Sequence, residues 1–110
     1  MDERERRIGE NEALFRQIND KVEGLNRSLA VLSTRMSVVC ECGRQDCLER
    51  IDLGVEEYER VRLDPASFVV KPEHVFPDVE DVVERHDRYW IVRKHEGDPA
   101  RLAEATDPRS

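Results

Sequence analysis

The apolar residues at the start of the chain recur at alternating steps of three and four. They are Ile8, Phe15, Ile18, Val22, Leu25, Leu29 and Leu32, and the polar Asn11 fills the one gap in the series. This spacing predicts a long amphipathic helix over residues 3–33. It also fits a coiled coil of nearly four heptads, whose a positions begin at Ile8 and whose d positions begin at Asn11.

Two interpretations of this helix stay open, because it could pair with a second helix or fold back on the rest of the chain. A polar Asn11 is tolerable opposite its own copy, and a helix of about 45 Å is too long for the remaining chain to cover completely. Against pairing, the flanking positions lack the charge pairs that select a coiled-coil partner, and Gly9 and Gly24 lower the helix propensity. We expect a protein partner or self-association through this helix, and hence a homo-oligomer.

Beyond Thr34 the pattern changes to alternating residues and short apolar runs broken by turn residues. It predicts strands over residues 37–42, 50–53 and 67–70, a helix over 55–63, and a hairpin with arms 79–85 and 89–94 that turns through 86–88. A last short helix is expected over 99–105, with Asp98 as its cap. The predicted fold class is therefore α+β, with an N-terminal helix over 1–34 and a small α+β domain over 35–110.

Three cysteines, Cys40, Cys42 and Cys47, lie within eight residues. Alternate residues at a strand end share a face, so Cys40 and Cys42 point to the same side. Gly43 gives the backbone the freedom to bring Cys47 back beside them. Three thiolates this close predict a zinc site that staples the small domain, with ordinary buried or free thiols as the alternative.

A fourth donor would close a tetrahedron around the ion, and the chain has three histidines to supply it. We favour His74, because Pro72 and Pro77 stiffen the loop that carries it. Glu41, Asp46, Glu49 or a water molecule could also complete the shell, while His86 and His95 fit surface positions. An iron–sulfur cluster shared by two chains is a further alternative, although such clusters normally take four thiolates.

Composition and charge bear on the partners and the cellular location that we expect for the protein. Of its 110 residues, 39% are charged and the net charge is −7, so the chain lacks the basic surface that nucleic acid requires. No apolar run is long enough for a membrane helix, and the N-terminus lacks the apolar core of a secretory signal. We expect a cytoplasmic protein with reduced thiols, which an odd cysteine count also favours.

The sequence contains no catalytic signature. The zinc-hydrolase motifs His-Glu-x-x-His and His-x-Glu with Pro-Cys-x-x-Cys are missing, and so is a glycine-rich phosphate loop. We therefore expect a regulatory or protein-interaction module with structural zinc rather than an enzyme. The alternative is a redox sensor in which oxidation of the cysteines releases the metal.

The order of several segments resembles a group of small uncharacterised actinobacterial proteins. These segments are Cys40-Glu-Cys42 with Cys47, residues 57–62, Phe68-Val69-Val70-Lys71-Pro72-Glu73-His74, and Thr106-Asp107-Pro108-Arg109. Members of the group usually have Pro-Gly-His where this chain has Pro72-Glu73-His74, so the histidine matches and the glycine does not. The resemblance implies an intracellular bacterial protein whose three cysteines and His74 form one site, and it implies no known activity.

Overall fold

The computed structural model describes residues 1–28 and 35–109 and contains three helices and five strands in that part of the chain. In order they are α1 (Glu3–Ser28), β1 (Arg35–Val39), β2 (Arg50–Gly54), α2 (Val55–Arg62), β3 (Ser67–Val70), β4 (Glu80–Arg85), β5 (Trp90–Lys94) and α3 (Asp98–Ala105). The protein is α+β, as the sequence predicts. Within the described residues, no helix has both the length and the apolar character needed to cross a bilayer.

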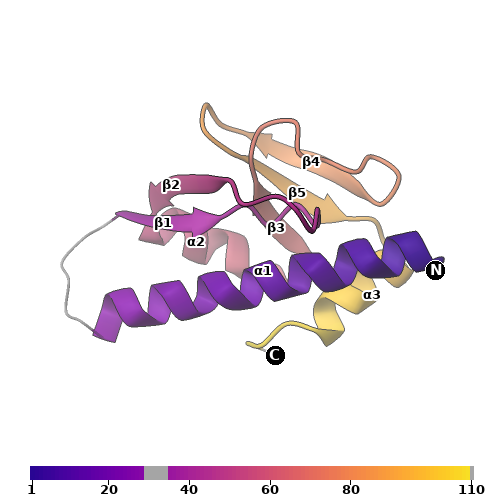
Figure 1. The fold of residues 1–110 in the computed structure, drawn as a ribbon, viewed down its shortest axis with the longest axis horizontal. Coiled ribbons are helices and arrows are strands. Elements are labelled where there is room, and N and C mark those ends of the chain that lie inside the picture. The colour runs from indigo at the N-terminus through magenta and orange to yellow at the C-terminus, as the bar shows by residue number, and fades with distance from the viewer. Residues whose placement is uncertain (29–34, 110) are drawn as a thin grey trace.

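The strands form two small antiparallel sheets, drawn side by side above α1 in Figure 1. β1 pairs with β2, and the side chains of Val38 and Ile51 on paired positions enter the core. The second sheet has the order β3-β5-β4, and an irregularity between Val82 and Glu84 shifts the register of β4. All four residues of β3 are buried, which places this strand at the centre of the molecule.

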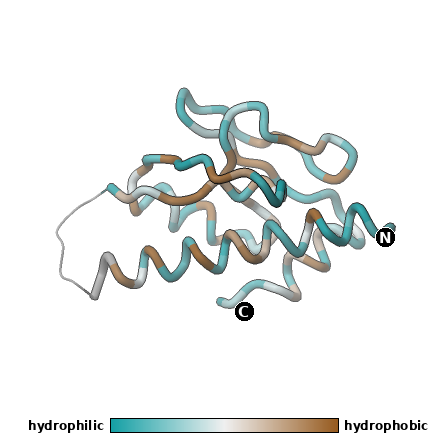
Figure 2. Tube along the Cα trace, viewed as in Figure 1, coloured by the Kyte–Doolittle hydropathy of each residue, from teal (hydrophilic) through white to brown (hydrophobic). Residues whose placement is uncertain are grey.

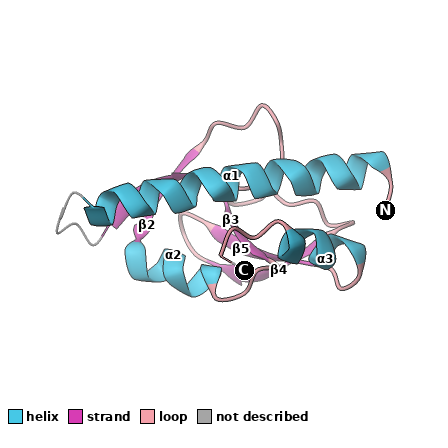
Figure 3. Ribbon diagram, turned by 90° about the horizontal axis from the view of Figure 1, so that it is seen from below, coloured by secondary structure: helices cyan, strands magenta, loops and turns pink. Residues whose placement is uncertain are grey.

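Helix α1 runs along the longest axis of the molecule. Its 26 residues give a length of about 39 Å at 1.5 Å per residue, against a longest extent of 43 Å. It packs against β1 and α3, and Figure 3 shows α2 and α3 on one side of it. The N-terminal helix therefore folds back on the small sheets along its described length.

The apolar residues of α1 divide between two faces. Ile8 and Phe15 are buried against the rest of the chain, whereas Leu14, Ile18 and Leu25 are 51%, 40% and 63% exposed. Figure 2 shows brown apolar segments alternating with teal hydrophilic ones along α1 after its hydrophilic first turns. The predicted seam residues Leu29 and Leu32 lie outside the described residues. Pairing through the exposed d positions stays a prediction.

The face of α1 that meets the core also carries four buried polar residues, which the heptad pattern does not anticipate. They are Glu12, Arg16, Asn19 and Glu23. Arg16 donates to the backbone carbonyl oxygens of Pro65 and Ala103, and its guanidinium lies 4.5 Å from the centre of the Phe68 ring. Buried polar groups need such partners, so α1 is docked by specific hydrogen bonds as well as by apolar contact.

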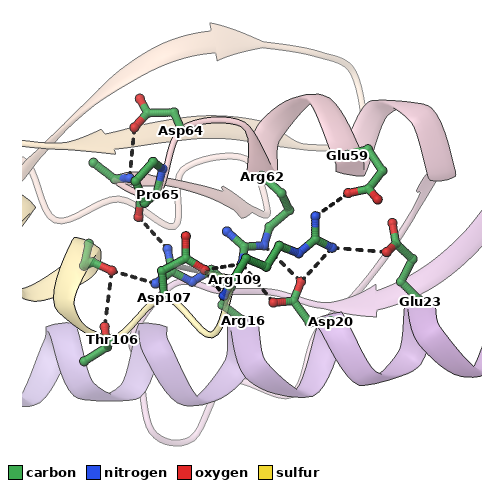
Figure 4. Close-up of polar contacts among 12 residues, drawn as sticks. Arg16, Asp20, Glu23, Glu59, Arg62, Asp64, Pro65, Thr106, Asp107 and Arg109 are labelled. Atoms are coloured by element: carbon green, nitrogen blue, oxygen red, sulfur yellow. Dashed lines mark hydrogen bonds and ion pairs between the residues drawn. The ribbon is translucent and has the colours of Figure 1, made fainter.

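A cluster of ion pairs, here called the arginine cluster, joins α1 to α2 and to the segment after α3 (Figure 4). Arg62 is buried on α2 and pairs with Asp20 of α1 at 2.8 Å and with Asp107 at 2.5 Å. Arg109 reaches back to Asp20 and to two further carboxylates, those of Glu23 and Glu59. Residues from three distant parts of the sequence thus hold one another in place.

Two predicted boundaries are wrong by a few residues. Strand β1 ends at Val39, before the cysteines, because the backbone then changes partners: the Cys40 amide donates to Glu49 and the Glu41 amide to Val69 of β3. Helix α3 begins at Asp98 with Gly97 as its N-cap, so Asp98 is in the first turn and is not the cap. The β4–β5 hairpin and α2 lie where the sequence predicts them, although α2 ends at Arg62.

Candidate metal centre

The three cysteines and His74 meet at one point of the fold. One ligand atom from each of Cys40, Cys42, Cys47 and His74 can be chosen so that all four lie within 4.8 Å of one another. The cysteines are buried and the histidine is partly buried. The four residues that the sequence singles out are therefore close enough to bind a single metal ion.

Residues 40–49 between β1 and β2, the cysteine loop, bring the three thiols together. Glu41 lies between Cys40 and Cys42 and points to the opposite side, into the core, where its carboxylate accepts hydrogen bonds from Asn19 and from the Val69 amide. The Cys47 amide donates to the Arg44 carbonyl at 3.1 Å, which closes the turn that returns the third thiol. Anchoring Glu41 inward therefore directs both flanking cysteines to the site.

Residues 71–79 between β3 and β4, the histidine loop, supply the fourth side chain. A tight turn starts where β3 ends, with the His74 amide donating to the Lys71 carbonyl at 3.0 Å. Pro72 and Glu73 occupy its two central positions, and Glu73 has a φ of 73°. Glycine is the usual residue at that conformation, so the chain accepts local backbone strain beside His74.

The spacing of the donor atoms fits tetrahedral coordination. His74 Nδ1 lies 3.6 Å from the sulfurs of both Cys40 and Cys47. An ion bound at ordinary zinc distances holds a sulfur and a nitrogen about 3.5 Å apart and two sulfurs about 3.8 Å apart. These two sulfur–nitrogen distances thus match the separation that such an ion requires, and the remaining donor atoms lie within 4.8 Å of one another.

The three thiols lie so close together that they shift one another's pKa values in different directions. A hydrogen bond from the Cys40 thiol lowers the pKa of Cys42 to about 5, and the same contact raises the pKa of Cys40. Burial raises the pKa of Cys47. The lowered pKa of Cys42 favours its thiolate, the form that binds metals.

Groups around the cluster hold the ligands in position. The Lys71 amide donates to the Cys40 sulfur at 3.2 Å, a contact typical of metal-bound thiolates. Asn11 of α1 donates to the Gly43 carbonyl at 3.0 Å. The polar residue of the predicted coiled-coil seam therefore has a partner within its own chain, and α1 supports the cysteine loop.

Of the other residues considered as fourth donors, three are engaged elsewhere and two lie at the rim of the site. Glu41 is turned inward, and His86 and His95 bond to Glu84 and Asp81 away from the cluster. Asp46 and Glu49 border an open pocket of about 420 Å³ beside Cys47 and His74. His74 is thus the histidine that the fold brings to the cysteines.

Comparisons of the chain with protein-family models, with curated proteins and with solved structures find no match. The metal centre is therefore inferred from its own side chains and their geometry, and the resemblance to actinobacterial proteins stays a prediction.

Proposed function

We propose that the protein is a small zinc-binding module in which the metal is structural and the surface binds a protein partner. The observation that carries the metal assignment is the convergence of three buried sulfurs and one imidazole nitrogen from two separate loops. Without an ion, burial and mutual crowding keep the pKa values of Cys40 and Cys47 raised, and a bound cation would offset the repulsion between thiolates and let all three ionise.

Zinc suits this donor set better than the other common metals. Three thiolates and one imidazole form a closed tetrahedral shell of the kind found in structural zinc sites, whereas hard cations such as magnesium and calcium prefer oxygen ligands. A closed shell leaves no position for substrate or an activated water, which supports a non-catalytic role. A reducing compartment such as the cytoplasm would keep the thiols available.

The ion would add a cross-link between two parts of the fold that hydrogen bonds between Glu41 and Val69 already connect. The cysteine loop belongs to the β1–β2 sheet, and the histidine loop follows β3 of the other sheet. A cross-link between the two loops fixes the sheets relative to each other. Small domains often need such a link, because their cores alone contribute little net stability.

Titration of the reduced, metal-free protein with Co²⁺, followed by displacement with Zn²⁺, tests the assignment. We expect one Co²⁺ per chain, with thiolate charge-transfer bands and the intense visible bands of a tetrahedral site. His74→Ala should weaken binding and change the spectrum, while the matched His86→Ala should behave as the wild type. Bands that are missing, or that His74→Ala leaves unchanged, would refute the four-ligand site.

The partner-binding part of the proposal is supported by the outer face of α1. Leu14, Ile18 and Leu25 are exposed there at helical spacing, opposite the face that packs on the sheets. Sedimentation of the zinc-loaded protein should show a concentration-dependent dimer that Ile18→Lys abolishes and that Gln17→Lys, one residue away, preserves. A monomer at all concentrations would rule out self-association and leave binding of a different protein as the role to test.

A redox sensor is the second candidate, favoured by the position of Cys47 beside the open pocket. There a peroxide could take two electrons from Cys47 and a neighbouring thiolate, which would join as a disulfide while the peroxide and two protons become two waters. A dye that reports free Zn²⁺ distinguishes the two roles. Stoichiometric peroxide should leave a structural site loaded, and rapid release of the ion would favour the sensor.

A further inference from the structure

A second buried cluster lies between α1 and the three-stranded sheet, outside the metal centre. Lys94 of β5 places its ammonium nitrogen 2.8 Å from a carboxylate oxygen of Glu12 on α1 and 3.0 Å from one of Glu80 on β4. The three residues are almost completely inaccessible to solvent. This carboxylate cluster is the point at which the N-terminal half of α1 is tied to the sheet by charge.

The charges of the cluster do not balance if both glutamates are ionised. One ammonium then faces two carboxylates in a buried site, where an uncompensated charge is expensive. The second oxygen of Glu80 accepts the Phe76 amide at 3.1 Å, whereas Oε2 of Glu12 is buried without a hydrogen-bond partner. A proton on that oxygen would remove the excess charge and provide a hydrogen bond to Glu80.

In the described part of the chain, the neighbouring groups do not compensate the charge of the second carboxylate. On the side of the cysteine loop, Glu12 packs against Gly43, where an added Cβ would come within 3.0 Å of its Cγ. Asp78 interacts electrostatically with Lys94 and so adds negative charge near the cluster. Its own ion pair is with the exposed Arg4. The local environment therefore favours the neutral form of Glu12.

We propose that Glu12 carries a proton at neutral pH and that Glu12, Glu80 and Lys94 form a proton-dependent latch that holds the N-terminal half of α1 on the sheet. This device is independent of the bound metal and goes beyond the proposed structural site. Loss of the proton places two negative charges on one ammonium and weakens the docking of α1. The segment so released carries Ile8 and Phe15, the buried a positions of the heptad pattern.

The latch should open as the pH rises. Burial, followed by the charge of Glu80, raises the pKa of Glu12 well above its ordinary value of 4.5. A group that binds its proton more tightly in the folded chain contributes stability that is complete below the unfolded pKa and is lost as the pH rises through the folded pKa. Alkaline solution therefore opens the latch and acid keeps it closed.

Carboxyl ¹³C NMR of the zinc-loaded protein observes the proton directly. Glu10 is the internal control, since it lies on the same helix with an exposed side chain. We expect the Glu12 resonance to titrate well above that of Glu10. Titration of the two residues at the same pH would overturn the proposal.

Amide hydrogen exchange between about pH 5 and about pH 9, corrected for the intrinsic rate, then tests the latch. Protection of the first half of α1 should fall at least tenfold with rising pH in the wild type and in Glu10→Gln, and should stay nearly constant in Glu12→Gln. Glu80→Gln leaves one carboxylate for Lys94 and should also remove the pH dependence of protection. It replaces Glu12→Gln as the test variant if Glu12→Gln does not fold. Unchanged pH dependence in whichever of these two variants folds would refute the latch.

Discussion

The metal centre and the arginine cluster both connect distant segments, but the first consists of metal-ligating side chains and the second of ion pairs. The metal centre gathers three sulfurs and an imidazole from two loops, and in our proposal an ion completes it. The arginine cluster joins α1, α2 and the segment after α3 entirely through the chain's own charges. If the metal centre binds zinc as proposed, a chelator should act on it, whereas loss of a single charge should act on the arginine cluster.

Strong acid should weaken the arginine cluster. Burial acts to raise the pKa of Asp20 and Asp107, but the hydrogen bonds and charge of Arg62, together with those of the other partners, outweigh it, and both pKa values lie below their ordinary range. Groups with lowered pKa values contribute stability that is present above the unfolded pKa and is lost as the pH falls through the folded pKa. Metal binding also weakens in acid, because protons compete for thiolates, so chelation is the cleaner way to separate the two regions.

The largest effect is expected from removing the metal. Chelation of zinc, or Cys42→Ser, should lower the free energy of unfolding by roughly 5 kcal/mol or more, since binding to a structural site is coupled to folding. Thermal unfolding by circular dichroism measures the loss. The chelator should have no further effect on Cys42→Ser. Equal stability with and without chelator would show that the four residues pack without an ion.

Breaking the arginine cluster should cost less than removing zinc. Arg62→Ala leaves the carboxylates of Asp20 and Asp107 without their buried partner, and such losses cost about 3–5 kcal/mol. Arg60→Ala is the matched control, because its ion pair with Glu84 is exposed and worth about 0–1 kcal/mol. Urea unfolding compares the two variants. Similar losses in both would mean that burial adds nothing to the cluster.

Gly43 connects α1 to the cysteine loop through close packing. It has a φ of 80°, and a Cβ there would lie 2.9 Å from a side-chain carbon of Ile8 and 3.0 Å from the Ile8 carbonyl oxygen. Gly43→Ala should therefore destabilise by about 2–4 kcal/mol and weaken zinc binding. Gly24→Ala is the control, since its Cβ meets nothing within 4 Å, and it should stabilise α1 by about 1 kcal/mol. If Gly43→Ala left the stability unchanged, the close packing of Gly43 on Ile8 would be contradicted.

The smallest expected effect is an increase in stability, from the substitution Glu73→Gly. Glu73→Gly relieves a positive φ beside His74 and, after the entropy cost of glycine, should raise stability by about 0.5–1 kcal/mol. Glu73→Ala keeps a Cβ and should give no such gain, which separates strain from charge. Thermal unfolding of the zinc-loaded variants tests this. A destabilised Glu73→Gly would indicate that the glutamate itself makes a needed contact.

The candidate site could be predicted from sequence because its signal is local. Cysteines are few in this chain and closely spaced, so Cys40, Cys42 and Cys47 can be recognised as candidate ligands from the sequence. The two prolines around His74 indicate a rigid loop. The inward anchor Glu41 was a weaker signal, visible only as the middle residue of an alternating triplet. The strand and helix order after Thr34 was also local, since it depends on periodicity and turn residues.

The docking of α1 could not be predicted in the same way. The heptad pattern is satisfied equally by a second helix or by the chain's own sheets, because periodicity shows which face is apolar and not what covers it. Glu12, Arg16 and Asn19 have the spacing of an ordinary charged face. Their partners Lys94, Pro65 and Val39 are between 20 and 82 residues away, so only the folded structure identifies them as buried.

Native mass spectrometry of the freshly purified, untagged protein, repeated under denaturing conditions, tests the metal centre most directly. We predict one zinc ion per chain that is lost on denaturation and is absent when Cys40, Cys42, Cys47 or His74 is replaced by alanine. A folded, metal-free protein with three titratable thiols would contradict the account and make thiol chemistry the function to pursue.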